Sequence, residues 1–310
     1  MTSSPPISLG ILSWRGHNSL SRTLASYAKE NLFSLADETV LFLPEAEDRT
    51  VALGEAYGLN VRTAPNNLGI LGGFQWMAEI LGNRFLLLLE DDCPLIEPHA
   101  EVKRQLTIAA KALEDGDVNV MRLRHRQFPG MGPRYTVIDK FHRYFPPDSA
   151  TQRQKQLAAL KRFARPGKAA RLAGNVLYEH GEPYSDPYTL PAPRPAPQVL
   201  RAQPPEELFS HWIVKRPEGY FRVSAKTMNW SNQSIFVEKT FFLEKIIAYA
   251  AQNPSRRLIN GFPDIEKELN SSYWRRSGWH VGLLPGLFSH ELPEHDLLPD
   301  LPFPPKDVPQ

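Results

Sequence analysis

Apolar residues occur along this chain in two patterns, as short unbroken runs and as residues spaced three or four positions apart. The run at 85–89 (FLLLL) does not alternate with polar residues, which is typical of a strand buried on both faces of a parallel sheet. Leu20, Leu24 and Tyr27 recur at helical spacing and predict an amphipathic helix over 19–28. The two patterns together predict that strands and helices alternate.

This alternation extends through the N-terminal part of the chain. Strands are predicted at 7–13, 38–43, 60–63, 84–89 and 118–123. Helices are predicted at 19–28, 50–57, 69–81 and 98–113. Short links between such elements favour right-handed crossovers, so the predicted fold class is α/β, with a mostly parallel sheet and helices on both faces.

The regular pattern stops near residue 124. Prolines, 29 in all, cluster in the segment 125–225 and near the C-terminus, which predicts an irregular proline-rich insertion and a loose tail. A basic helix is predicted at 151–165, and a solvated face is the favoured interpretation. Its alternative is contact with a phosphate-bearing or membrane-bound acceptor. Further strands are predicted at 220–224, 234–238 and 279–284, and helices at 240–252 and 265–276.

Composition and charge narrow the classes of function. The chain has 310 residues, 23% of them charged and 42% hydrophobic, which suits a soluble globular protein. A formal net charge of +2 gives no support for nucleic-acid binding. The sole cysteine excludes an internal disulfide framework and a cysteine-based zinc site, and it fits a reducing cytosol. We see neither a signal peptide nor a run of about 18 apolar residues, so we expect a cytoplasmic protein.

Three acids follow the buried strand directly. Glu90, Asp91 and Asp92 would lie at the carboxyl end of that strand, where parallel sheets bind ligands. Adjacent carboxylates repel one another unless a positive charge joins them, and a hard divalent cation that bridges to a phosphate is a natural partner. The alternative is an acidic loop that only caps the strand. Because the strand is predicted to be buried on both faces, we favour a ligand site.

Four segments of the chain resemble parts of glycosyltransferases of the GT-A fold, most closely the large inverting family 2. They are ISLGILSWRGHNSLSRTLASY, NNLGILGGFQWM, LLLLEDDC, and PDIEKEL together with GLFSH. They resemble, in order, the opening strand and helix, the Asn-x-Gly segment beside the nucleotide, the strand with the DxD motif, and the late acidic motif with the His that ends the catalytic core. The form Glu90-Asp91-Asp92 is similar to the motif of N-acetylglucosaminyltransferases that build N-glycan branches.

The resemblance implies an enzyme that moves a hexosyl or N-acetylhexosaminyl group from a nucleotide-diphospho-sugar, a UDP-sugar, to a glycan or lipid-linked acceptor with inversion. Such a reaction belongs to polysaccharide biosynthesis and needs Mn²⁺ or Mg²⁺. The implied metal ligands are Asp92, Glu90 and His290. Glu90 would contact the ribose or reach the metal through water, and Asp91 could reach either. No nucleic-acid partner is implied, and membrane contact would be at most peripheral, at the inner face.

The resemblance also places the nucleotide over the ends of the first two strands. The candidate contacts to base, ribose and diphosphate are Ser13, Trp14, Arg15, Glu45, Asn66 and Asn67. Gly72 and Gly73 either let the backbone approach the ligand closely or let their helix pack tightly against the sheet.

Inversion requires one base that deprotonates the acceptor hydroxyl. Pro263 stands where the common family pattern has Glu, so Asp264 is the first candidate base and Glu266 the second. Both also have structural interpretations, because Asp264 suits a helix N-cap and Glu266 favours the helix dipole. Four aromatic residues either stack on sugar rings or pack in the core: Trp230, Tyr273, Trp274 and Trp279.

The predicted domain organisation follows from these matches. Residues 1–124 form the nucleotide-sugar-binding half, 125–225 an acceptor-shaping insertion, 226–292 the acceptor and catalytic half, and 293–310 a flexible tail. Three other functions stay open: a sugar-phosphate nucleotidyltransferase, a metal-dependent phosphohydrolase, and a non-catalytic nucleotide- or glycan-binding protein of the same fold. The nucleotidyltransferase ranks lower because the loop after the first strand has one Gly and one Arg rather than a glycine-rich basic sequence.

Overall fold

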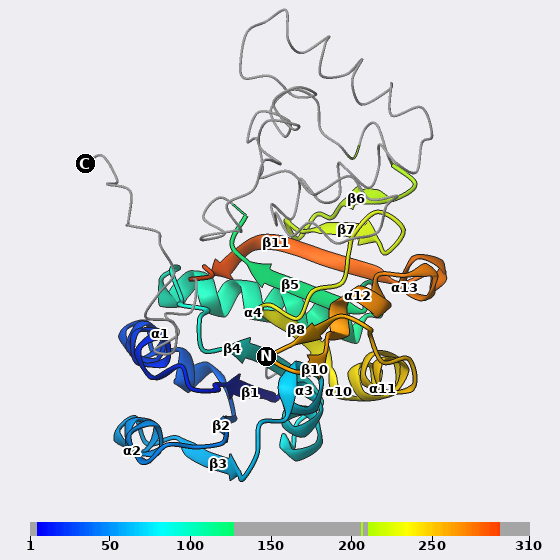
Figure 1. Cartoon of the computed structure of the whole chain (residues 1–310). Helices are drawn as coiled ribbons and strands as arrows, with labels where there is room; N and C mark the ends of the chain where they lie inside the picture. The colour runs from blue at the N-terminus through cyan, green and yellow to red at the C-terminus, as the bar shows by residue number, and fades with distance from the viewer. Residues whose placement is uncertain (1–4, 127–205, 207–209, 292–310) are drawn as a thin grey trace, which may run out of the picture.

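The computed structural model describes residues 5–126, 206 and 210–291, and within them nine strands form a central sheet (Figure 1). The strands are β1 Ile7–Leu12, β2 Glu38–Pro44, β3 Asn60–Ala64, β4 Phe85–Glu90, β5 Val120–Arg124, β6 Ile213–Lys215, β7 Phe221–Ser224, β8 Ile235–Glu238 and β11 His280–Phe288. Their order across the sheet is β3-β2-β1-β4-β8-β5-β11-β7-β6. Because only β8 and β7 run against the others, the sheet is mixed but largely parallel.

Helices cover both faces of the sheet, as the alternating pattern predicts. The helices of the N-terminal part are α1 His17–Lys29, α2 Asp48–Ala56, α3 Gly69–Ile80 and α4 His99–Glu114, with a short 3₁₀ turn η1 at Leu32–Leu35. The later ones are α10 Lys239–Phe241, the π-helical η2 Phe242–Ile247, α11 Ala248–Gln252, α12 Ile265–Leu269 and α13 Ser272–Arg276. None of the helices in the described residues has the length and apolar character needed to cross a bilayer.

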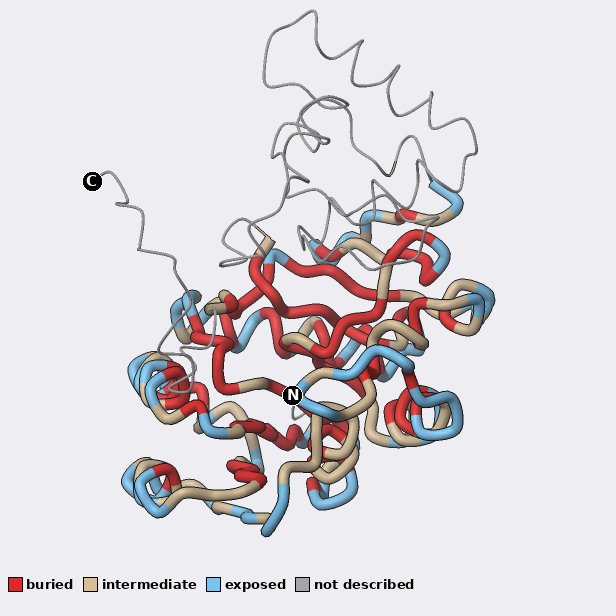
Figure 2. The backbone as a smooth tube through the Cα atoms, in the orientation of Figure 1, coloured by how far each residue is buried: buried red, intermediate tan, exposed pale blue. Residues whose placement is uncertain are grey.

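Strand β4 is buried on both faces (Figure 2). Leu86 and Leu88 belong to an apolar core with α3 and the C-terminal helices. Phe85, Leu87 and Leu89 alternate with them and join a second core with α1 and α4. The continuous apolar run therefore serves two cores at once, which confirms the interpretation of its pattern.

Strand β8 lies between β4 and β5, so two strands that follow each other in the alternating pattern are not neighbours in the sheet. It runs antiparallel to both. Phe236 of β8 stacks on Phe85 of β4, with ring centres 5.9 Å apart. A segment more than 100 residues further along the chain thus completes the centre of the sheet.

The prediction of one continuous helix over 265–276 is wrong. It is divided into α12 and α13 at Asn270 and Ser271. The Asn270 amide bonds the backbone of Trp230 twice, at 2.7 Å and 2.9 Å, and the Ser271 hydroxyl caps α13 by accepting from the N–H of Tyr273. These side-chain bonds compete with helix continuation, which is the reason for the break.

The segment 125–225 is described only in part. β6 and β7 fall within it and pair with the central sheet through β11. The basic helix predicted at 151–165 and the tail at 293–310 lie outside the described residues. The division into a nucleotide half, an insertion and a catalytic half stays a prediction.

Candidate active site

A pocket of about 240 Å³ opens where β1, β2 and β4 end. Glu90, Asp91 and Asp92 line it, as do Trp14 after β1 and Pro44 at the end of β2. The acids lie at the carboxyl edge of the sheet because β1, β2 and β4 are parallel. They therefore face the cleft at a strand end where α/β sheets bind ligands.

Asp92 is brought next to His290 by backbone pairing. The N–H of Ser289 donates to the carbonyl of Pro94 at 2.9 Å, and the N–H of Glu291 donates to the carbonyl of Asp92 at 2.8 Å. His290 Nε2 consequently lies 3.0 Å from Asp92 Oδ2, and both residues are at most 9% exposed. The sequence separates these two side chains by almost 200 positions.

Two polar side chains, Gln233 and Asp92, approach the same nitrogen of His290. Gln233 Nε2 lies 2.9 Å from His290 Nε2, and Gln233 Oε1 accepts a hydrogen bond from the guanidinium of Arg124. An arginine can only donate, so the Gln233 amide presents its N–H to His290, whose Nε2 accepts. An imidazole nitrogen and a carboxylate oxygen thus converge, and both are ligand types that divalent cations take; a cation here would replace the Gln233 N–H at Nε2. His290 Nδ1 is buried and has no hydrogen-bond partner among the described residues.

The fit to a divalent cation rests on this pair. No trio of His, Cys, Asp or Glu in residues 5–126 and 210–291 is arranged as a ready metal cage. Asp92 and His290 supply one oxygen and one nitrogen, and a catalytic metal usually takes further ligands from water and substrate phosphate. The donor set therefore fits an open site, and Glu90 as a further ligand stays a prediction.

Asp91 holds the loop after β1 in place. Its Oδ2 accepts the Ser13 hydroxyl at 2.6 Å, and its carbonyl accepts the Thr23 hydroxyl at 2.6 Å. A Cβ on Gly16 would lie 1.9 Å from Asp91 Oδ2, so glycine is required there. Burial, and after it the charge of Asp92, raises the pKa of Asp91 to about 8.

Three side chains gather at the ends of β1 and β2. The Trp14 indole N–H donates to Glu45 Oε2 at 2.8 Å, and a guanidinium nitrogen of Arg15 lies 3.3 Å from the same oxygen. The Arg15 guanidinium stands 5.2 Å from the centre of the Trp14 ring. Arg15 and Glu45 have left-handed φ angles of 54° and 48°, a backbone strain that often marks ligand sites.

Of the candidate residues around the start of α3, only one lines the pocket. Asn67 lines the pocket, and its Oδ1 accepts from the N–H of Gly69 at 2.8 Å, whereas Asn66 is exposed and does not line the pocket. A Cβ on Gly73 would lie 2.6 Å from Leu12, and neither Gly72 nor Gly73 lines the pocket. The structure therefore supports the interpretation that Gly73 lets α3 pack tightly on β1, rather than letting the backbone approach a ligand.

A hairpin that the sequence analysis missed forms another wall of the pocket. β9 Leu258–Ile259 and β10 Phe262–Pro263 pair antiparallel around Asn260 and Gly261. The latter two have φ angles of 50° and 86°, as in a two-residue type I′ turn. Ile259 and Asn260 line the pocket. The Asn-Gly dipeptide between apolar residues was the signal that could have identified this hairpin.

Asp264 follows the hairpin as the N-cap of α12. Its Oδ1 accepts from the N–H of Glu266 at 2.9 Å. Its Oδ2 lies 3.5 Å from a guanidinium nitrogen of Arg257 and has no hydrogen-bond partner among the described residues. Glu266 Oε1 accepts from the N–H of Asn232 at 2.8 Å. Neither acid lines the pocket.

The four aromatic residues singled out in the sequence do not line the pocket either. Trp230 and Trp274 are fully buried and meet edge to face, with ring centres 5.4 Å apart. Tyr273 stacks on Tyr249 at 3.6 Å, and Trp279 packs against the edge of Tyr273. Packing is the role these contacts support.

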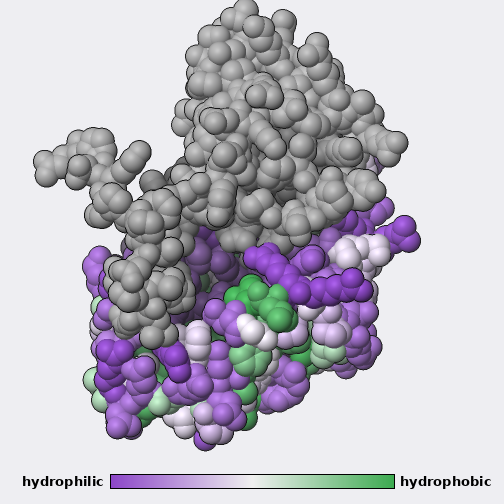
Figure 3. Space-filling model, in the orientation of Figure 1, coloured by the Kyte–Doolittle hydropathy of each residue, from purple (hydrophilic) through white to green (hydrophobic). Residues whose placement is uncertain are grey.

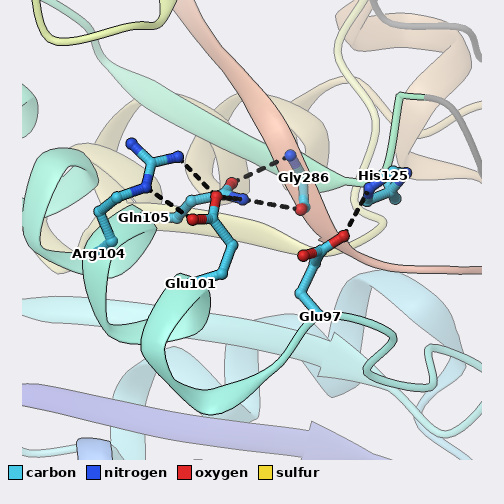
Figure 4. A network of polar contacts seen from close by, with 6 residues as sticks. All are labelled: Glu97, Glu101, Arg104, Gln105, His125 and Gly286. Atoms are coloured by element: carbon cyan, nitrogen blue, oxygen red, sulfur yellow. Dashed lines mark hydrogen bonds and ion pairs between the residues drawn. The ribbon is translucent and has the colours of Figure 1, made fainter.

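Strand β11 shifts its register with β5 between Leu283 and Phe288, and Gln105 contacts this stretch at Gly286 (Figure 4). The Gln105 amide bonds both the N–H and the carbonyl of Gly286 at 3.0 Å. Gly286 has a φ of 97°, and a Cβ there would lie 2.4 Å from the carbonyl oxygen of Arg124, so only glycine fits. Nearby, His125 Nε2 contacts Glu97 Oε1 at 3.0 Å, and burial lowers the pKa of His125.

Comparisons with known proteins give structural similarity only. No protein-family model and no curated protein matches the chain. TarS 1–349 of S. aureus is similar at a TM-score of 0.47 and 10% identity, over 92% of this chain and 60% of that one. The same fragment with UDP-GlcNAc gives a TM-score of 0.45 and 11% identity, over 93% and 59%. The mannosyltransferase PcManGT of Pyrobaculum calidifontis, in complex with GDP-Man and Mn²⁺, gives 0.33 and 12%, over 40% and 36%. The chain thus spans 60% of the TarS fragment.

Proposed function

We propose that this protein is a metal-dependent glycosyltransferase that moves a sugar from a nucleotide-diphospho-sugar, a UDP-sugar, to the hydroxyl of a saccharide or lipid-linked acceptor, with inversion. The observation that carries the proposal is the convergence of Asp92 and His290, 3.0 Å apart, at the end of a strand buried on both faces. The protein acts in the cytoplasm with at most peripheral membrane contact.

Asp92 and His290 would hold a Mn²⁺ or Mg²⁺ ion, with Glu90 beside them. A bound divalent ion supplies positive charge to the diphosphate leaving group, on which negative charge increases as the sugar leaves. Asp91 faces the loop after β1 through its bond to Ser13, so it keeps that loop against the acids. In this arrangement the carboxylates bind and orient the donor rather than react with it.

The nucleotide would lie over the ends of β1 and β2. The Trp14 ring offers an apolar face for a base or ribose, and its indole N–H is oriented by Glu45. The Arg15 guanidinium contacts the same oxygen of Glu45 and lies over the Trp14 ring.

Asp264 is the proposed base for the acceptor hydroxyl. Its Oδ1 is occupied by the N-cap bond, which holds the carboxylate rigidly, while Oδ2 makes only the 3.5 Å contact with Arg257 among the described residues. Glu266, whose Oε1 accepts from the N–H of Asn232, is the second choice. A carboxylate held in one orientation is suited to accept a proton.

Calorimetric titration of UDP, with and without Mn²⁺, tests the proposal. We expect binding that depends on the metal in the wild-type protein and is lost in Asp92→Asn, together with transferase turnover. Asp115→Asn is the matched control, because this exposed carboxylate pairs with Lys111 on α4 away from the pocket. Preference for a nucleoside triphosphate would favour a nucleotidyltransferase, and full activity of Asp92→Asn would refute the metal mechanism.

A further inference from the structure

The hairpin β9–β10 gives the pocket a polar side chain that the protein itself does not use. Asn260 lines the pocket, and its amide has no hydrogen-bond partner among the described residues. Leu258 beside it is 59% exposed, and Figure 3 shows an apolar spot over this hairpin next to a hollow in the surface. Asn260 therefore has a free donor and a free acceptor at the pocket wall.

The other polar side chains that line the pocket are charged or have at least one polar atom bonded within the protein. Asn67 Oδ1 accepts from Gly69, and the Trp14 indole N–H donates to Glu45. The three acids carry the charge of the pocket and suit a metal and a diphosphate. Asn260 is thus a neutral group that can donate and accept at the same time, which is what neighbouring sugar hydroxyls require.

The Asn260 side chain stands on a rigid support. The type I′ turn determines the backbone at Asn260 and Gly261. A Cβ on Gly69 would lie 2.5 Å from Phe262, so the hairpin packs directly against the start of α3. At its base the N–H of Asp264 donates to the carbonyl of Arg257 at 2.9 Å. The backbone that carries the exposed Asn260 side chain is therefore held in place at the pocket wall.

We infer that Asn260 recognises the transferred sugar of the donor, by bonding its hydroxyl or acylamino groups; this inference rests on the proposed function. The nucleoside belongs at Trp14 and the diphosphate at the acids, so the sugar must extend toward a remaining wall. The hairpin is the wall that leads directly to Asp264, the proposed base.

The test is the variant Asn260→Gly, which removes the amide and keeps the turn, because glycine adopts positive φ freely. Its affinities for UDP and GDP and for the corresponding UDP- and GDP-hexoses are measured by calorimetry with Mn²⁺. Loss of one or two hydrogen bonds predicts affinity for the nucleotide-sugar weaker by about 3- to 10-fold. Affinity for the free nucleotide should stay within about 2-fold, since the nucleotide does not reach the hairpin.

Asn31→Gly is the matched control. Asn31 also has a left-handed φ, of 51°, but lies between α1 and η1 and does not line the pocket. It should bind both ligands like the wild type, with a similar change in melting temperature. Unchanged nucleotide-sugar affinity in Asn260→Gly would overturn this inference alone. Absence of metal-dependent nucleotide binding in the wild type would overturn the proposed function and the inference together.

Discussion

At the scale of single residues, the pocket concentrates carboxylates where water is scarce. Asp91 and Asp92 are 9% and 8% exposed, and burial together with the charge of Asp92 raises the cost of ionising Asp91. Ser13 offsets part of that cost by donating its hydroxyl to Asp91 at 2.6 Å. Such a pair is stable when neutralised by protons or by a cation, and this gives the site its expected dependence on pH.

Asp91 should make the metal-free protein less stable as the pH rises. Its pKa is raised from 3.8 to about 8 in the folded state, mainly by burial, so between these values the folded protein binds more protons than the unfolded chain. The free energy of unfolding should therefore fall as the pH rises through this window. Urea denaturation at several pH values in the presence of a chelator measures it.

The variant Asp91→Asn checks the assignment. Asn can still accept the Ser13 hydroxyl but does not ionise, so the decline of stability across this pH range should become shallower. An identical slope in the wild type and Asp91→Asn would show that other groups cause the decline.

The variant Asp264→Asn should separate the two roles of Asp264, as catalytic base and as helix N-cap. Asn is as good an N-cap as Asp, so Asp264→Asn should fold with little loss of stability. Its turnover should fall by about 100-fold or more if the base is lost, while donor affinity stays unchanged. Initial rates and calorimetry measure the two effects. If Glu266→Gln reduced turnover and Asp264→Asn did not, Glu266 would be the base.

At the scale of elements, tight contacts between secondary-structure elements shape the site. Gly73 lets α3 lie against Leu12 of β1, and Gly69 lets the β9–β10 hairpin lie against the start of α3. The Gln105 amide and Gly286 form the bulge of β11 that precedes His290. These contacts hold α3 against β1, the β9–β10 hairpin against α3, and α4 against β11.

Gly73→Ala should destabilise the protein despite the higher helix propensity of alanine. The added Cβ would lie 2.6 Å from a Leu12 methyl carbon, and overpacking of this kind costs about 1–3 kcal/mol. Gly72→Ala is the matched control, because its Cβ meets only the Cβ of Leu68, at 3.1 Å. Chemical denaturation of both variants measures the difference. Equal stability of the two would contradict the packing role of Gly73.

Local patterns predicted most of the elements well. The strands and helices between residues 7 and 124 occur within a few positions of their expected bounds, because each has a distinct apolar period. The break at Asn270 could not be predicted, since it depends on that side chain meeting the backbone of Trp230. The hairpin at Asn260 was predictable from its Asn-Gly turn, and its place in the pocket was not.

At the scale of the whole molecule, the sheet brings two distant parts of the chain to one edge. β8 inserts between β4 and β5, and β11 pairs with β5, so the C-terminal part of the chain completes the sheet begun by the N-terminal part. As a result Asp92, from the N-terminal part, meets His290, from the C-terminal part. The proposed sugar site likewise has acids from one part and a hairpin from the other.

The sequence by itself determined the α/β class, the buried strand and the three acids at its end, because these depend on neighbouring residues and on the period of their apolar positions. Only the tertiary structure decided which strands are neighbours, that His290 lies beside Asp92, and that Asn260 faces the same pocket as the acids. His290 is about 200 positions from Asp92, and Asn260 about 170 from Glu90, so the packing of the complete sheet places these residues rather than any local preference.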